Sequence, residues 1–170
     1  NYNLTTKKTL SSSSSSTTST STSTTKTPLV VELGCGLGLP SLVAALSSSR
    51  VHAMATDGSP MSLALARETA RRNGIDATRI RFVPFDWDEA WPPSSSSWRK
   101  EDDEQNRADY CLASDTIYSR SCVEDFIDVI KRVTAPAGGV VAVATRDGRR
   151  GVDLFWEMVR CDEDFEDVRE

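Results

Sequence analysis

The chain has 170 residues and a formal net charge of −5 at pH 7, and its lysines and arginines are scattered along it. A chain of this length predicts one domain that buries roughly two thirds of its unfolded surface. The acidic balance argues against a nucleic-acid-binding surface, and no stretch reaches the ~20 apolar residues that a membrane-spanning helix needs. We therefore expect a cytoplasmic protein, with the nucleus as the alternative, that binds neither nucleic acid nor membrane.

Cysteine and histidine content excludes several kinds of site. The four cysteines, Cys35, Cys111, Cys122 and Cys161, lie far apart without a Cys-x-x-Cys pair, and His52 is the single histidine. Neither a zinc site nor a disulfide framework is indicated. A histidine-dependent catalytic triad is also not expected, because His52 lies within an apolar, strand-like run.

Two segments are too polar to contribute to a core. Residues 1–27 are almost entirely Ser, Thr and Lys, which bury too little apolar surface to offset the entropy of ordering the chain. We expect a disordered tail there and one folded domain over residues 28–170. Residues 91–107 combine a serine run with a charged run and predict a polar surface insertion in that domain.

The first predicted unit is a strand over residues 29–33, a glycine turn and a helix over about residues 39–47. Three glycines follow the strand at every second position: Gly34, Gly36 and Gly38. This is a nucleotide-type turn, but the third glycine of the dinucleotide motif Gly-x-Gly-x-x-Gly and the lysine of a phosphate-binding loop are both missing. Glu32 places a carboxylate beside the glycines, which disfavours phosphate and suits a cationic or hydroxyl-rich ligand.

A second apolar run over residues 51–57 ends in Asp57 and completes a βαβ unit with parallel strands. A carboxylate about 20 residues beyond such glycines is where the hydroxyls of a ribose are bound. The alternative is a turn or capping residue in the sequence Asp57-Gly58-Ser59-Pro60. We favour ribose binding by Asp57 because of the glycines upstream.

The next unit is a helix that starts behind the N-cap Ser59 and ends at Gly74, followed by a strand over about residues 79–84. After this strand, Asp86 can accept a hydrogen bond from an adenine amino group while Trp87 covers the ring. Spacing alone equally allows a loop acid beside a core tryptophan.

The remaining elements continue the alternation of strands and helices. A fourth strand over residues 108–113 leads into Asp115, and Ser121 with Glu124 predicts a capping box at the start of the next helix. A fifth strand is expected over residues 140–145, with one more helix after it. This order predicts an α/β fold, a Rossmann-like, doubly wound and mostly parallel sheet flanked by helices.

Acidic residues close four successive strands: Glu32, Asp57, Asp86 and Asp115. Ligands of open α/β sheets bind outside these carboxyl ends, so we expect the four carboxylates around one crevice. Such a rim suits a sugar, an adenine and a positive centre. S-adenosylmethionine has all three without phosphate, and it is the cofactor that the sequence favours.

Four motifs carry a more specific likeness: Val31-Glu32-Leu33-Gly34-Cys35-Gly36-Leu37-Gly38, Thr56-Asp57-Gly58-Ser59, Asp86-Trp87 and Ala113-Ser114-Asp115-Thr116-Ile117-Tyr118. Together they resemble the seven-strand methyltransferases of the family 16 protein-lysine type, which include the calmodulin-lysine and elongation-factor-2-lysine enzymes. The resemblance covers about residues 29–160. The combination of the Asp-Trp pair with an Asp-x-x-Tyr motif makes it selective.

The resemblance implies how S-adenosylmethionine would be bound. The three glycines would approach its methionine and ribose parts, and Asp57 would hold the ribose hydroxyls. Asp86 and Trp87 would border the adenine. Ala113 would line the cofactor pocket.

The resemblance also implies a reaction, the transfer of a methyl group to a lysine side chain that a protein substrate presents. Asp115 would orient the lysine ammonium and Tyr118 would shape the channel through which it enters. No metal ion is needed, because the sulfonium already carries an activated methyl group. We expect a monomer.

Two departures from the family pattern leave alternatives open. Residues 1–27 stand where family members have a Trp-containing cover, and the chain ends where they have a further hairpin, so we expect part of both to be lacking. One alternative is a small-molecule N-methyltransferase, and another is a catalytically inactive cofactor-binding or interaction module. A third alternative is an NAD oxidoreductase, but the third glycine of the dinucleotide motif Gly-x-Gly-x-x-Gly is missing.

Overall fold

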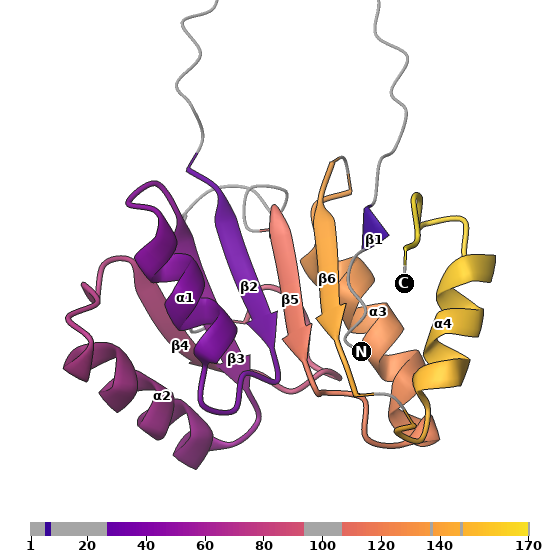
Figure 1. Cartoon of the computed structure of the whole chain (residues 1–170), viewed down its shortest axis with the longest axis horizontal. Coiled ribbons are helices and arrows are strands. Elements are labelled where there is room, and N and C mark those ends of the chain that lie inside the picture. The colour runs from indigo at the N-terminus through magenta and orange to yellow at the C-terminus, as the bar shows by residue number, and fades with distance from the viewer. Residues whose placement is uncertain (1–5, 8–26, 94–106, 137, 147, 170) are drawn as a thin grey trace, which may run out of the picture.

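The computed structural model describes residues 6–7, 27–93, 107–136, 138–146 and 148–169. The strands and helices (Figure 1) follow one another along the chain in the order β1 (Thr6–Lys7), β2 (Leu29–Leu33), α1 (Leu39–Ser47), β3 (His52–Asp57), α2 (Pro60–Arg72), β4 (Ile80–Pro84), β5 (Tyr110–Ser114), α3 (Val123–Val133), β6 (Val140–Ala144) and α4 (Val152–Cys161). None of the helices in these ranges is long and apolar enough to cross a bilayer.

The strands form one sheet in the order β1-β6-β5-β2-β3-β4. From β6 to β4 every pair of neighbours is parallel, so the carboxyl ends of these strands meet at one edge. The predicted α/β fold with a doubly wound, mostly parallel sheet is confirmed. The chain order reverses between β2 and β5, which is the switch point where ligands of such sheets bind.

Helices lie on both faces of the sheet, with α1 and α2 on one face and α3 and α4 on the other (Figure 1). Side chains alternate between the faces, so Ala53 packs with Leu42 of α1 while the next residue, Met54, joins the larger core. That larger core contains the fully buried rings of Phe126 from α3 and Phe155 from α4. The α1 side of β5 and β6 carries no helix among the described residues (Figure 1).

The structure differs from the sequence expectations in two places. Thr6–Lys7, expected in a disordered tail, pairs antiparallel with β6 as β1. The rest of that tail, residues 1–5 and 8–26, lies outside the described residues, as does most of the expected insertion, residues 94–106.

The capping box expected at Ser121 and Glu124 is wrong. A 3₁₀ turn, Arg120–Cys122, precedes α3, and its last residue is the N-cap without a side-chain capping bond. Ser121 lies inside that turn, and its hydroxyl oxygen is 2.9 Å from Ser119 Oγ. By contrast, Ser59 caps α2 as predicted, because its hydroxyl accepts a hydrogen bond from the backbone N–H of Ser62.

Candidate active site

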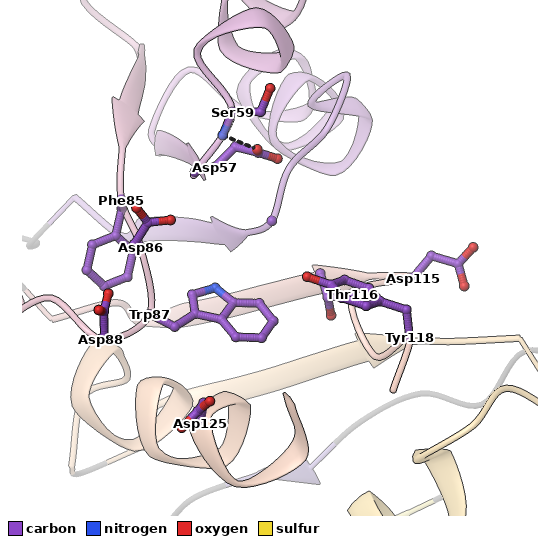
Figure 2. Close-up of a pocket in the computed structure, with 12 residues that line it drawn as sticks. Asp57, Ser59, Phe85, Asp86, Trp87, Asp88, Asp115, Thr116, Tyr118 and Asp125 are labelled. Atoms are coloured by element: carbon purple, nitrogen blue, oxygen red, sulfur yellow. Dashed lines mark hydrogen bonds between the residues drawn. The ribbon is translucent and has the colours of Figure 1, made fainter. Parts of the chain in front are cut away.

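A cavity of about 810 Å³ opens at the edge of the sheet where β2, β3, β4 and β5 end (Figure 2). Its walls come from the segments that follow these strands and from the start of α3: Gly34, Asp57, Gly58, Ser59, Phe85, Asp86, Trp87, Asp88, Asp115, Thr116, Tyr118 and Asp125. Three of the four carboxylates expected around one crevice therefore share it, namely Asp57, Asp86 and Asp115.

The turn after β2 requires glycine at its first position. Gly34 has a φ of 61°, and a Cβ atom there would lie 2.7 Å from Cγ2 of Thr116. The absence of a side chain lets the turn pack directly against the segment after β5. Gly36 and Gly38 are not among the lining residues. The backbone N–H of Gly36 instead donates a hydrogen bond to Asp57.

Asp57, the last residue of β3, is held by two backbone groups. Its Oδ2 accepts a hydrogen bond from the N–H of Gly36 and its Oδ1 accepts one from the N–H of Ser59, both at 2.8 Å (Figure 2). Each oxygen of an ionised carboxylate can accept about two hydrogen bonds. Both oxygens of Asp57 therefore retain acceptor capacity for the hydroxyls of a ligand.

Asp86 and Trp87 follow β4 and form a second wall. The carboxylate of Asp86 lies over Gly58, where an added Cβ would be 2.3 Å from Oδ1. The indole of Trp87 packs on Phe126 of α3 with ring centroids 5.1 Å apart. Arg132, on the same helix, donates a hydrogen bond to the backbone carbonyl of Trp87. These contacts fix the indole in the middle of the cavity (Figure 2).

Asp115 and Tyr118 border the cavity from the segment after β5. Arg149 donates hydrogen bonds to Oδ2 of Asp115 at 2.8 Å and to its backbone carbonyl at 3.2 Å. The carboxylate of Asp115 extends away from Trp87, whereas the ring of Tyr118 extends toward it (Figure 2). Tyr118 is 67% exposed, so it lies at the mouth of the cavity.

The structure does not bring Glu32 to the cavity. This residue is 1% exposed, and its Oε2 accepts a hydrogen bond from the N–H of Ser41 in the first turn of α1 at 2.9 Å. Burial raises the pKa of Glu32 from its usual 4.5 to about 7, although the hydrogen bond from Ser41 lowers it. Glu32 thus joins β2 to α1 behind the glycine turn.

Ala113 also lies apart from the large cavity. It is buried, and with Pro40 and Leu112 it lines a separate cavity of about 170 Å³. The cofactor contacts expected for Ala113, Gly36, Gly38 and Glu32 stay predictions.

Several lining residues were not predicted from the sequence: Ser59, Phe85, Asp88, Thr116 and Asp125. Ser59 was predicted only as a helix cap, and Thr116 lies unassigned inside the Asp-x-x-Tyr motif. Asp125 belongs to a helix that was predicted to cover the sheet. The sequence signal that could have placed Asp125 at the cavity is its position in the first turn of the helix that follows β5.

The lining is acidic and aromatic. It contains no lysine or arginine. Its five carboxylates are those of Asp57, Asp86, Asp88, Asp115 and Asp125. Arg149, beside the cavity, is paired with one of them. Within the described ranges, no group of three or more His, Cys, Asp or Glu residues is arranged to hold a metal ion. The charge of the cavity favours a cationic ligand and disfavours phosphate.

Comparisons with solved structures define the class of fold. The chain matches the [4+2]-cyclase SpnF with a TM-score of 0.60 and 22% identity, over 79% of this chain and 49% of that one. It matches PKMT2 from Rickettsia typhi, solved in complex with AdoHcy, with a TM-score of 0.50 and 18% identity, over 66% of this chain and 20% of that one. At such identities these matches establish a Rossmann-like fold and no more.

The sequence comparison is more specific. A model of the lysine methyltransferase family matches residues 4–161, and the chain belongs to that family. Ribosomal protein L11 methyltransferase of Xanthomonas axonopodis pv. citri (strain 306) is 39% identical over 57 residues, which are 34% of this chain and 18% of that protein. The chain therefore spans less than a fifth of that relative. The family predicted from the four motifs is confirmed.

The raised pKa of Glu32 predicts a pH-dependent stability. Because the folded state binds this proton more tightly than the unfolded state does, the contribution of Glu32 to stability falls as pH rises from its unfolded pKa of 4.5 through its folded pKa of about 7. Glu32→Gln keeps an acceptor for Ser41 but cannot ionise. Between pH 5 and pH 8, wild type should lose about 2 to 3 kcal/mol of unfolding free energy relative to this variant in urea titrations.

Glu124→Gln, an exposed change of the same kind on α3, is the control and should follow wild type. Parallel pH profiles for wild type and Glu32→Gln would show that the pKa of Glu32 is not raised in the folded protein.

Proposed function

We propose that this chain binds S-adenosylmethionine in the cavity and transfers its methyl group to the side chain of a lysine in a protein substrate. Family membership supports the reaction class. The observation that carries the proposal is the lining of the cavity, which has five carboxylates, three aromatic rings and no basic side chain. A sulfonium and a lysine ammonium are both cations, and carboxylates and aromatic faces both attract cations.

The described residues fit this cofactor. The cavity volume of about 810 Å³ lies within the range of roughly 300–1,000 Å³ found for small-molecule sites. The two oxygens of Asp57 can accept hydrogen bonds from the ribose hydroxyls. Asp86 can accept one from the adenine amino group, with the indole of Trp87 against the ring. Gly34, without a side chain, leaves room at the turn for the methionine part.

The remaining task of the protein is to align a neutral amine. When bound, S-adenosylmethionine supplies a methyl group already activated by the positive sulfur. A lysine with a pKa near 10.4 must first lose its proton, and removal from water in a narrow channel favours that loss. In this proposal the exposed ring of Tyr118 forms one wall of the channel, and Trp87 forms the opposite wall. Asp115 borders the same mouth.

We further propose that the protein acts in the cytoplasm or nucleus. Four cysteines within the described ranges are free thiols, namely Cys35, Cys111, Cys122 and Cys161. Free thiols fit a reducing compartment. The monomeric state expected from the sequence stays a prediction.

Transfer of label from S-adenosyl-[methyl-³H]methionine into lysate proteins tests the proposal. Wild type should label a protein band, and mass spectrometry should locate the methyl group on lysine. Asp57→Ala, which removes the expected partner of the ribose, should lower the initial rate by at least about tenfold. Asp76→Ala changes an exposed carboxylate outside the cavity and should retain the wild-type rate. Label found only in small molecules would indicate an N-methyltransferase of another kind, and no label with intact cofactor binding would indicate an inactive module.

Gly58→Ala tests the adenine side of the cavity. The new methyl group would overlap Oδ1 of Asp86, a flexible side-chain end that can move without unfolding the protein. We expect the dissociation constant of S-adenosylhomocysteine to rise by about tenfold in calorimetry, because Asp86 would lose its position. Gly74→Ala is the control: an added Cβ there meets open space, but the φ of 68° strains any residue other than glycine, so this variant should lower stability and leave that constant unchanged. If Gly58→Ala and wild type bound S-adenosylhomocysteine with equal affinity, Asp86 would not be part of the binding site.

A further inference from the structure

The sheet ends at β4, and no described strand pairs with its outer edge (Figure 1). On the inner side, the backbone N–H of Phe85, just after β4, donates a hydrogen bond to the carbonyl of Asp57 in β3. Successive residues of a parallel strand direct their backbone groups to opposite sides, so those of Ile80 and Phe82 point away from β3. A strand edge of this kind can accept a further strand from another chain.

A second cavity, of about 580 Å³, lies between this edge and α2, and we call it the edge groove. Residues from both faces of β4 line it. Ile80 and Phe82 pack on the side of α1 and α2, whereas Val83 belongs to the larger core on the other face, to which Arg81 also points. The edge groove therefore follows the edge of the strand and not one face of the sheet.

The lining of the edge groove is basic. Arg67, Arg71 and Arg81 contribute three guanidinium groups. Glu68 is the single acidic side chain among its described lining residues, and Arg71 and Arg72 already bind its two oxygens, at 2.7 and 2.8 Å. Positive charge is thus in excess in the edge groove, although the chain as a whole carries a net charge of −5. This excess favours an anionic partner.

Arg67 lies where a partner strand would meet it. Its side chain is exposed, and its guanidinium carbon lies 5.7 Å from the ring centre of Phe82. Its Nη2 is 3.5 Å from the carbonyl oxygen of Phe82, which is too long for a strong hydrogen bond. A guanidinium has five N–H donors, so Arg67 can bond a carboxylate on a strand that pairs with Phe82.

The edge groove is close to the candidate active site along the chain. Val83 lines the edge groove, while Phe85 and Asp86, directly after β4, line the large cavity. Three residues of a strand span about 10 Å, so an extended segment that lies along Phe82 would reach the large cavity within a few residues. The two sites also differ in charge, because the large cavity attracts an ammonium and the edge groove attracts carboxylates.

We propose that the edge groove docks an extended, acidic segment of the protein substrate. This segment pairs with the backbone of Ile80 and Phe82, and its carboxylates bond Arg67 and Arg71. The identity of the partner as a substrate rests on the proposed function, whereas binding to the edge groove does not depend on methyl transfer. The substrate lysine accordingly lies within a few residues of acidic side chains.

Fluorescence anisotropy with the full chain tests docking directly. The probe is a fluorescein-labelled peptide in which Glu and Val alternate. Wild type should bind it, and Arg67→Gln should weaken binding by about tenfold, because a charged hydrogen bond is lost. A peptide with Gln in place of Glu should bind wild type about tenfold more weakly. A Glu-Val peptide with N-methyl groups at alternate residues should also bind more weakly, because it lacks N–H groups that pair with a strand edge.

Arg72→Gln is the matched control. It removes the same charge from an exposed residue of α2 outside the edge groove, and it should bind the probe as wild type does. The proposal is overturned if Arg67→Gln binds the probe normally, or if the Gln peptide or the N-methylated peptide binds wild type as tightly as the probe. Tighter binding of oligouridylate than of the probe would also overturn it, because the edge groove would then be a surface for nucleic acid.

Competition links the edge groove to the reaction. An excess of the Glu-Val peptide should inhibit the labelling of lysate proteins by wild type with S-adenosyl-[methyl-³H]methionine, and the Gln peptide should not. A Glu-Val peptide that binds without inhibiting would overturn the assignment of its site to the substrate. If no protein is labelled even without peptide, the proposed function fails, and the anisotropy measurements still decide whether the edge groove binds an acidic strand.

Discussion

The parallel alignment of β2, β3, β4 and β5 determines where the chemistry of this protein lies. Parallel strands bring all their carboxyl ends to one edge, so side chains far apart in the sequence become neighbours there. The helices that cover the sheet also shape the cavity. Phe126 of α3 lies in the core and supports Trp87, while Asp125, one residue earlier, lines the cavity. Core packing and the candidate active site thus share the same helix.

Much of this arrangement follows from local sequence patterns. Apolar runs that end in an acid predicted the strands, and the positions of Asp57, Asp86 and Asp115 at the cavity follow from that pattern alone. Gly34 was predictable because a tight turn with close packing requires glycine. The Asp-x-x-Tyr motif, joined to the other three motifs, was enough to predict the family.

The exceptions depend on contacts that no local pattern encodes. Glu32 is the second-last residue of β2, whereas Asp57 is the last residue of β3. Asp86 and Asp115 come after the ends of β4 and β5. Glu32 is directed to α1, where it accepts a hydrogen bond from Ser41. Asp115 meets Arg149, which is 34 residues away and carries no recognisable signal. The 3₁₀ turn before α3 shifts the helix start past Ser121, and the same shift places Asp125 in the first turn.

The central claim is that an acidic crevice beside a glycine turn without phosphate-binding groups accepts an adenosyl sulfonium. Calorimetric titration of the full chain with S-adenosylmethionine and, in parallel, with NAD tests it most directly. The account predicts one saturable site for S-adenosylmethionine and an affinity for NAD at least about tenfold weaker, because its two phosphates would meet the carboxylates of the cavity. Saturable binding of NAD without binding of S-adenosylmethionine would contradict it.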